Sequence, residues 1–466
     1  MPLIDSFGYP LSLSDEAALG HWTETVRAFL AHSSKTPVHL ARTVELAPDF
    51  ALAHAAHGLF CMLLGRRELV CTAEDDWCRA SAGQQRVGAT ERERAVIDAL
   101  RDWLDGRPSR AASRLDLMLA SYPRDALLMK LVHAIRFVLG DSVGMRRSLA
   151  TVSGAYDSGH PAYGYMLGCQ SFALEETGDY AEAEKLGRDA LQHAPDDAWG
   201  LHAVAHVLDM NGRSGEGRIW LETNTAAFAH CNNFRFHVWW HLALMYLDQG
   251  NVDRVLALYD QEIRAERTDD YRDISNAASL LVRLEIEGVH VGGRWEELAS
   301  LSEARVNDHC NVFADLHYML SLVGADRRRA ADQMLASMSA HAEEPTDMGR
   351  IAGAAGVQVA LGLESYRLGN FFSAYRHFTE GRRNLRDIGG SHAQRDVFER
   401  IAIDATMRAG MPEEAEQLLR ERVALRGATD RFSAERLEQV TRMARRTALM
   451  QNPRLRAEPQ RAVWGN

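Results

Sequence analysis

The fold is decided by the stretch Gly178-Asp179-Tyr180-Ala181-Glu182-Ala183-Glu184-Lys185-Leu186-Gly187-Arg188-Asp189-Ala190-Leu191-Gln192-His193-Ala194-Pro195. Gly178 follows one amphipathic helical pattern and precedes a second, so we expect it to turn the chain between two helices. The small side chains of Ala183 and Ala190 let these helices approach closely, and Pro195 closes the unit. One such unit is therefore predicted to fold as a helix-turn-helix.

Glycines in this position recur along the chain at spacings of 34 to 45 residues. They are Gly106, Gly140, Gly178, Gly212, Gly250, Gly288, Gly324, Gly369 and Gly410. A two-helix repeat of about 34 residues is the tetratricopeptide pattern. Because one unit cannot bury its apolar stripe alone, neighbouring units must stack. The sequence therefore predicts an all-α, tetratricopeptide-like α-solenoid, curled around a central pocket.

Composition limits the functions that this chain can have. Of its 466 residues, 46% are hydrophobic and 25% are charged, as in ordinary soluble globular proteins. The net charge of -11 and the pI near 6.0 argue against a nucleic-acid partner. No apolar run approaches the roughly 20 residues that span a bilayer, and residues 1–10 lack the basic start of a signal peptide. The six cysteines form no C-x-x-C pair, which favours reduced thiols and a cytoplasmic location.

We expect one repeat array with short additions at its ends. Residues 1–35 precede the first helix pair and are predicted to be an N-terminal cap, and residues 36–450 to be one continuous solenoid. Within it, residues 66–92, with Glu74-Asp75-Asp76, are predicted to be a longer charged connection. Residues 451–466 have no apolar period and are predicted to be a disordered tail.

Two predicted helices, 197–211 and 236–249, each carry a pair of histidines four residues apart. The pairs are His202 with His206 and His237 with His241, and Trp199 and Trp240 lie on the same faces. Each helix directly precedes a repeat glycine, so the two are first helices of consecutive units. First helices line the concave side of a tetratricopeptide solenoid. We therefore expect the four imidazoles to lie side by side on its inner wall.

A carboxylate and a fifth imidazole occupy a comparable position further along the chain. Asp315 lies nine residues before its repeat glycine, as His241 does, and His317 is close by. If the solenoid bends strongly, Asp315 can orient one of the imidazoles for proton transfer. The candidate catalytic residues are therefore His202, His206, His237, His241, Asp315 and His317.

Such a wall supports several chemistries. His202, His206, His237 and His241 can bind a metal, and zinc, iron and manganese are the candidates. The same residues can act as general acids and bases without a metal, or hydrogen-bond an anionic ligand. Neither pair has the H-E-x-x-H form of a zinc peptidase. Histidines and tryptophans that only pack between helices are the remaining alternative. Beyond this metal, the sequence predicts no cofactor.

Two other stretches offer ligand-binding residues. In 389–398, Ser391 and Gln394 form a predicted capping box, while Arg395 and Asp396 lie in the first helical turn, where free amides can hold an anion. Structural capping explains this stretch equally well. In the loop 288–295, glycines with Arg294 could cradle a phosphate, although a turn with a packed tryptophan is favoured. With the two helical tryptophans, the candidate ligand-binding residues are Trp199, Trp240, Arg294, Gln394, Arg395 and Asp396.

Several motifs extend these features over most of the chain. They are Asp197-Ala198-Trp199 with His202, Ala205-His206 and Met210; His237 with Trp240-His241; Ser279, Arg283-Leu284, Gly288, Gly292 and Arg294-Trp295; Asp308-His309, Phe313, Asp315 and His317; and Gly389-Gly390-Ser391 with residues 393–398. With them the chain resembles the tetratricopeptide repeat protein 38 family, and the last motif is very specific. The family also shows His54 and His133. It usually has a glutamate at Asp209, an asparagine at Ala314 and an acidic residue at Asn276. The resemblance implies a soluble α-helical repeat protein and brings no settled reaction.

Two functions remain open on the sequence alone. In the first, the histidines, aspartate and tryptophans line a concave pocket that binds a small polar or anionic molecule, with hydrolase or lyase chemistry by histidine acid-base catalysis. In the second, the concave groove is a non-enzymatic scaffold that binds a peptide or a partner protein. A second copy of this chain is a further candidate partner, whereas nucleic acid and membrane are not.

Overall fold

The computed structural model describes residues 3–451, with side chains up to residue 446. The described residues contain no β-strand, and only two isolated bridges, Ile4 to Pro10 and Ser33 to Cys231, join extended segments. The all-α class is therefore confirmed. The predicted tail, 451–466, lies outside the described residues except for Gln451, which is helical. Among the described helices, none combines the length and the apolar character that crossing a bilayer requires.

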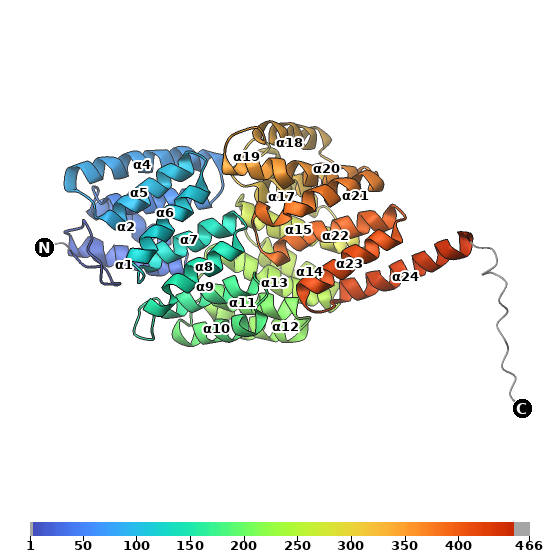
Figure 1. Ribbon diagram of the computed structural model, residues 1–466, viewed down its shortest axis with the longest axis horizontal. Helices are drawn as coiled ribbons and strands as arrows, with labels where there is room; N and C mark the ends of the chain where they lie inside the picture. Colours follow the sequence, from blue (N-terminus) through green and yellow to red (C-terminus); the bar gives the residue numbers. More distant parts are fainter. Residues whose placement is uncertain (1–2, 452–466) are drawn as a thin grey trace, which may run out of the picture.

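Helices pack in consecutive pairs joined by short turns (Figure 1). Ten of these pairs are α1 (Glu16–Leu30) with α2 (Thr36–Leu46), α3 (Ala51–Leu63) with α4 (Arg67–Val87), α5 (Glu91–Leu104) with α6 (Pro108–Ser121), α7 (Ala126–Val138) with α8 (Ser142–Val152), α9 (Tyr163–Glu175) with α10 (Tyr180–His193), α11 (Ala198–Met210) with α12 (Ser214–Thr223), α13 (Phe234–Asp248) with α14 (Val252–Leu258), α15 (Tyr271–Ile286) with α16 (Arg294–Glu303), α17 (Val312–Gly324) with α18 (Arg328–His341), and α20 (Val357–Arg367) with α21 (Phe371–Gly381).

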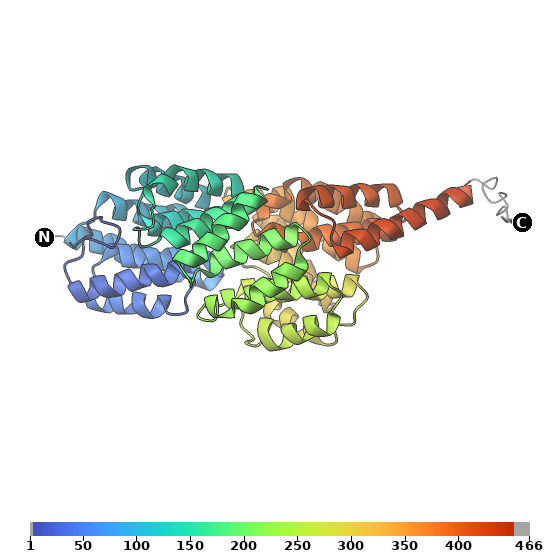
Figure 2. The same ribbon diagram turned by 90° about the horizontal axis from the view of Figure 1, so that it is seen from below.

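The last pair, α22 (His392–Arg408) with α23 (Pro412–Arg426), is followed by the long helix α24 (Arg431–Gln451). A short helix, α19 (Asp347–Ile351), leads through a π-helical segment, η4 (Ala352–Gly356), into α20. The other irregular segments are η1 (Ser153–Ala155), η2 (Thr225–Ala227), η3 (Tyr259–Ile263) and η5 (Arg382–Ile388). Figure 2 shows the chain running from the N-terminal helices at one end to α24 at the other.

The repeat glycines end the first helix of each pair in a left-handed conformation, as their spacing predicts. Gly324 is the exception among the nine, because it is the last residue of α17 and lies against the indole of Trp295. In that unit Asp326 has the positive φ instead, at 57°. Aspartate tolerates this conformation better than most residues, so the turn is kept two positions further on.

The first helices form the inside of the solenoid. All 13 residues of α11 are buried, whereas its partner α12 buries only Ser214, Gly217 and Leu221. An inner helix is covered on every side by its own partner and by the neighbouring units, and an outer helix on one side only. The two histidine helices are therefore inner helices, as predicted.

One predicted connection is a helix. Residues 67–87 form α4, which pairs with α3, so the prediction of a charged connection over 66–92 was wrong. Buried residues recur along it at Ala73, Asp76, Ala80 and Gly83, at the spacing of one helical face. The acidic residues Glu74 and Asp75 lie on its solvent side. The predicted cap, 1–35, contains α1, which packs on α2.

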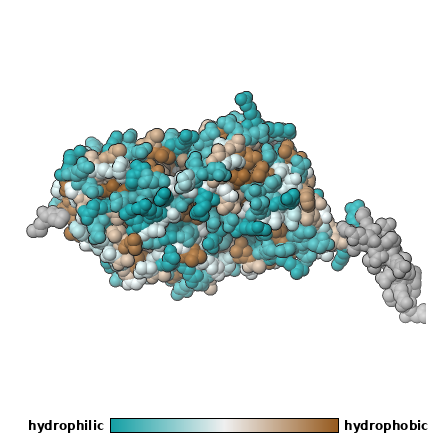
Figure 3. All heavy atoms as spheres, turned by 45° about the horizontal axis from the view of Figure 1, so that its top comes forward, coloured by the Kyte–Doolittle hydropathy of each residue, from teal (hydrophilic) through white to brown (hydrophobic). Residues whose placement is uncertain are grey.

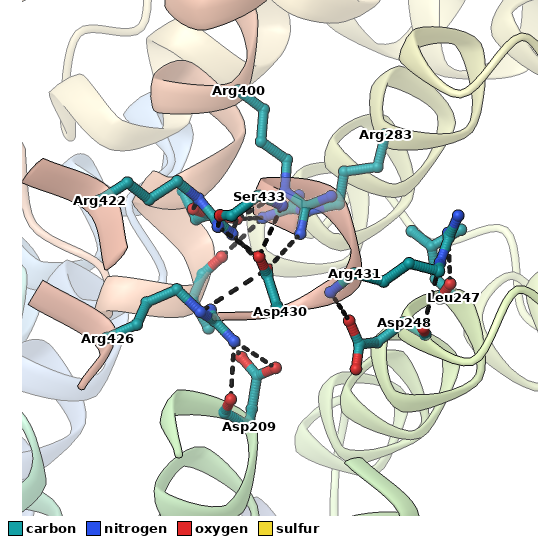
Figure 4. A network of polar contacts seen from close by, with 12 residues as sticks. Asp209, Leu247, Asp248, Arg283, Arg400, Arg422, Arg426, Asp430, Arg431 and Ser433 are labelled. Atoms are coloured by element: carbon teal, nitrogen blue, oxygen red, sulfur yellow. Dashed lines mark hydrogen bonds and ion pairs between the residues drawn. The ribbon is translucent and has the colours of Figure 1, made fainter. Parts of the chain in front are cut away.

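The solenoid curls, and ion pairs join its C-terminal units to its central ones. Arg426 of α23 donates to Asp209 of α11, with Nη2 3.0 Å from Oδ1. The backbone amide of Arg431 donates to Asp248, at the end of α13, over 2.9 Å. Figure 4 shows these contacts as parts of one network. Residues more than 180 positions apart in the chain are thus held side by side.

Candidate functional site

Four histidines converge where α11 and α13 lie side by side. Nε2 of His202 lies 2.9 Å from Nε2 of His206 and 3.0 Å from Nε2 of His237. Nε2 of His241 lies 3.1 Å from Nε2 of His237. One nitrogen from each of the four side chains is within 4.8 Å of the other three. The two helices therefore bring the four predicted imidazoles to a single centre.

Aromatic side chains seal this centre. His202, His206, His237 and His241 are 2%, 0%, 8% and 0% exposed. Rings of Phe172, Trp199, Phe234 and Trp240 contact the imidazoles, and the indole of Trp240 stacks on His237 with 5.2 Å between ring centroids. Substrate entering from solvent would have to displace these rings. The centre is thus a closed cluster, which differs from the open wall that a catalytic pocket needs.

Two of the imidazoles contact a polar group through the ring nitrogen that points away from the centre of the cluster. Nδ1 of His237 lies 2.9 Å from Oδ1 of Asn276 on α15. Because an amide oxygen only accepts, His237 donates its Nδ1–H, and its Nε2 carries the lone pair. Nδ1 of His206 lies 3.5 Å from Oε2 of Glu175, the last residue of α9. The family that this chain resembles usually has an acidic residue at position 276. Asn276 still presents a side-chain oxygen to His237 there.

Burial and charge set the protonation of the cluster. Burial lowers the pKa of His237 to about 3 and holds the pKa of His202 and of His241 well below the usual value. Burial, the largest single influence, acts in the same direction on His206, but the carboxylates of Glu175, Glu176 and Asp209 together raise the pKa of His206. Three of the four imidazoles are therefore neutral near pH 7, with a nitrogen lone pair free to bind.

Asp315 and His317 do not join this cluster. Among the described residues, no hydrogen bond, ion pair or ring contact connects either side chain to the four histidines. Asp315 pairs with His309, with Oδ2 3.1 Å from Nδ1. His317 donates through Nδ1 to the carbonyl oxygen of Phe313 over 2.7 Å. The expectation that Asp315 orients one of the four imidazoles was wrong, because α15 packs between α13 and α17.

The first turn of α22 is occupied by the protein's own groups. Ser391 and Gln394 form the predicted capping box. Arg395 donates to the carbonyl oxygen of Gly390 and lies 3.2 Å from Oε2 of the buried Glu176. The carboxylate of Glu176 therefore takes the place that an anionic ligand would fill.

Asp396 belongs to the ion-pair network of Figure 4, together with Arg400 and Arg422. This network lines a hollow of about 20 Å³, which has room for about one water molecule. Its walls come from α11, α13, α15 and α22 to α24. This hollow is thus lined mainly by paired charges, and the four histidines are not among its lining residues.

A larger groove of about 490 Å³ lies on the surface. It is bounded by the loop 288–293, the end of α17, the turn between α20 and α21, and the end of α22. Trp295 packs into its wall and is 5% exposed, as the favoured interpretation of that loop predicted. Arg294 instead pairs with Asp260, with Nη2 2.6 Å from Oδ2, and does not line the groove.

The remaining predicted ligand residues belong to the cluster's wall. Trp199 donates from its indole nitrogen to Nε2 of His133 over 3.1 Å. Arg283 lies over the ring of Trp240, with Cζ 5.4 Å from the centroid. Both indoles therefore contact protein groups and present no free face to a ligand pocket.

Glu175 is a site residue that sequence reasoning missed. It is fully buried, and both carboxylate oxygens lack a hydrogen bond within the described residues. The sequence contained a signal that could have identified it. Glu175 lies three residues before its repeat glycine, Gly178, as Asp209 lies three residues before Gly212. Acidic residues at the same position of neighbouring inner helices indicate a shared inward direction.

Asp197, the N-cap of α11, makes stability depend on pH. Burial raises its pKa to about 7. Because the folded protein holds this proton more tightly than the unfolded chain, stability falls as the pH rises from about 4 to 7. We expect Asp197→Asn, which keeps the cap, to gain about 2 kcal/mol relative to wild type between pH 5 and pH 8. Thermal unfolding of both proteins at the two pH values measures this; an equal difference at both would contradict it.

Comparison with known proteins adds little to this description. No family model matches the chain. The crystal structure of the yeast Tom70 matches with a TM-score of 0.37 and 12% identity, over 95% of this chain and 90% of that chain. A similarity at this level carries no argument. The fold class rests on the helix pairs themselves, and the likeness to the tetratricopeptide repeat protein 38 family remains a resemblance.

Proposed function

We propose that the protein is a scaffold that binds a peptide segment of a partner protein in the surface groove beside the turn between α20 and α21. The observation that supports this most is the pair of large apolar side chains flanking the groove. Leu368 and Phe372 are 51% and 58% exposed, and their chain neighbours Arg367, Gly369 and Phe371 line it. Exposed apolar groups next to a concavity are typical of protein-binding surfaces.

The groove itself offers an apolar floor. Its lining includes Val289, Leu320, Leu363, Tyr366 and Phe371. A hollow of about 490 Å³ can accept one or two large side chains of a peptide. Because the apolar surface continues outward over the turn, the matching ligand is an extended segment rather than a compact small molecule. On the face shown in Figure 3, hydrophilic residues predominate and apolar residues lie in small groups.

Charge adds a second requirement on the peptide. Arg367 and Arg408 lie at the rim and are exposed. Arg408 rests over the rings of Tyr366 and Phe371, with Cζ 5.7 and 5.3 Å from their centroids, and its Nε pairs with Asp404 over 2.6 Å, so Arg367 offers the less neutralised charge. The acidic lining residue Glu285 accepts a hydrogen bond from the indole of Trp295. A segment with an acidic residue next to an apolar anchor therefore suits this rim best.

The alternative function, an enzyme or small-molecule pocket at the histidines, has less support. The four imidazoles are at most 8% exposed, and Asp315 lies outside their reach. Acid-base catalysis requires a substrate atom within hydrogen-bond distance of the imidazole. Aromatic side chains fill the space that such a substrate would need.

The scaffold function is tested with a displayed random-peptide library selected against the full chain. We expect enriched peptides to combine an apolar anchor with acidic neighbours. The double variant Leu368→Ser and Phe372→Ser should bind them at least about tenfold more weakly, a loss of about 1.4 kcal/mol, in a fluorescence-polarisation titration.

The matched control is the double variant Leu117→Ser and Ile219→Ser, which removes apolar side chains that are 70% and 53% exposed on other helices. It should bind the peptides as wild type does. Selection of no peptide, or equal weakening by the two double variants, would refute the assignment of the groove.

A further inference from the structure

A cluster of four imidazole nitrogens has a geometry that can be compared with metal sites. A tetrahedral zinc ion with Zn–N bonds of about 2.0–2.1 Å holds its nitrogen ligands about 3.3–3.4 Å apart. The Nε2 separations along the chain of contacts from His206 through His202 and His237 to His241 are 2.9, 3.0 and 3.1 Å. The remaining three pairs of ligand nitrogens lie within 4.8 Å of one another, so small rotations of the rings would bring all four nitrogens around one central ion.

We propose that His202, His206, His237 and His241 form a closed tetrahedral site for a divalent transition metal, and that zinc is the ion that fits it best. Neutral imidazole nitrogens are favoured ligands of zinc, and zinc is almost always tetrahedral in structural sites. Magnesium and calcium prefer oxygen ligands, and copper(II) prefers a square-planar arrangement. This site is separate from the surface groove and does not depend on it.

Two of the four imidazoles have an outer contact of the kind found at metal sites, whereas Nδ1 of His202 and of His241 has no hydrogen-bond partner among the described residues. A histidine that binds a metal usually donates its other ring N–H to an oxygen, which fixes the tautomer. His237 does so with Asn276 over 2.9 Å. His206 presents Nδ1 to the carboxylate of Glu175 at 3.5 Å. Both contacts leave Nε2 directed at the centre of the cluster.

Glu175 supplies an independent reason for a cation. Its side chain is fully buried, and neither carboxylate oxygen makes a hydrogen bond within the described residues. A buried carboxylate is costly unless a charge or hydrogen bonds compensate it. A divalent ion held by His206, on the far side of the imidazole ring, provides that charge; without an ion, the proton that Glu175 favours on His206 provides it.

Without an ion, the cluster is poorly satisfied. Nε2 of His237 is an acceptor, since its Nδ1 donates to Asn276. It faces the Nε2 atoms of both His202 and His241, at 3.0 and 3.1 Å. Either two N–H groups share this one lone pair, or a second lone pair faces it, whereas a single ion would bind all four nitrogens.

The expected role of this ion is structural. Four protein ligands complete a tetrahedral shell and leave no position for water or substrate. The pairs come from α11 and α13, the inner helices of consecutive units, so the ion would cross-link two units at the middle of the chain. Loss of the ion is therefore expected to lower the unfolding temperature.

The test uses the full chain purified without a histidine tag or chelator. Plasma mass spectrometry should find about one zinc ion per chain. Stripping with a strong chelator should lower the unfolding temperature by several degrees, and zinc but not magnesium should restore it. Cobalt loaded in place of zinc should give the visible absorption of a tetrahedral site. These measurements on the wild-type protein do not depend on the folding of any variant.

Variants locate the ion. His202→Ala with His241→Ala should lose it, whereas His241→Cys, which supplies another zinc ligand, should keep it. His317→Ala is the buried control and should keep it. His57→Ala is the second control, because His57, Cys61 and Asp76 form a separate group within ligand distance. Retention of zinc in the double variant, or its loss in His57→Ala, would overturn the assignment. So would wild-type protein that takes up no added zinc.

Glu175→Gln tests the charge argument separately. It keeps the shape of the side chain and all four ligands, so the stoichiometry should remain one ion per chain. Loss of the carboxylate behind a ligand should weaken zinc binding by about 10- to 100-fold, measured by competition with a chromophoric chelator. An unchanged affinity would show that Glu175 does not position or compensate the site.

Discussion

Arg422→Met is expected to destabilise the C-terminal units by about 3 kcal/mol, because it removes the closest cation from two buried carboxylates, Asp396 and Asp430. Arg422 lies 2.6 Å from Asp396 through Nε, and its Nη atoms lie 2.8 Å from Asp430 and 2.6 Å from the hydroxyl of Ser433. One side chain thus joins α22, α24 and the loop between α23 and α24 (Figure 4). Urea unfolding measures the loss, and hydrogen exchange should place it in α22 to α24.

The pH dependence of this loss has a defined sign. Burial alone would raise the pKa of Asp430, but the guanidinium groups of Arg422, Arg426 and Arg400 together hold that pKa well below the usual range. In the wild-type protein, the stability that these pairs contribute is therefore present above the unfolded pKa of about 3.9 and lost only in stronger acid. In Arg422→Met burial is opposed less strongly, so the loss of stability should be at least as large at pH 8 as at pH 5.

Arg420→Met is the matched control, on the same helix. Arg420 is 74% exposed on its side chain and, among the described residues, pairs only with Glu416, four residues before it. Exposed pairs of this kind contribute at most about 0.5 kcal/mol. A similar loss in both variants would mean that α23 itself, and not the buried network, sets the stability.

Gly389→Ala is expected to cost about 3–5 kcal/mol, from a forbidden backbone conformation combined with a steric conflict. Gly389 has φ 90° and ψ -169°, a region that only glycine adopts readily. A Cβ atom there would lie 2.4 Å from the carbonyl oxygen of Val138, at the end of α7. Because Val138 O is a backbone atom, relief requires α7 and the start of α22 to move apart. Thermal and urea unfolding measure the cost.

Gly88→Ala separates the two contributions. Gly88 has nearly the same backbone conformation, φ 85° and ψ 177°, but an added Cβ would meet nothing within 4 Å. It should lose only the conformational part, about 1–3 kcal/mol. The excess in Gly389→Ala then reports the contact between α22 and α7. Equal losses of stability in the two variants would show that α7 and α22 can move apart at this contact without a measurable free-energy cost.

Local sequence patterns predicted much of the fold. The glycine spacing predicted the helix pairs, and the steps of four in His202, His206, His237 and His241 predicted neighbouring inner helices with facing imidazoles. These features depend on residues within one or two turns of each other, where periodicity and turn chemistry are decisive. The same reasoning failed over 66–92, where acidic residues on the exposed side of α4 concealed its buried face.

The sequence by itself determined the helical repeat and the chemistry of the four imidazoles; tertiary structure alone decided what surrounds them. Asp315 matched His241 in its distance from the repeat glycine, yet it pairs with His309 because α15 separates it from the cluster. Glu175 faces His206 only because α9 packs on α11. Curvature sums small packing angles over many units, so contacts between distant units, such as Arg426 with Asp209, follow from the whole stack and from no local pattern.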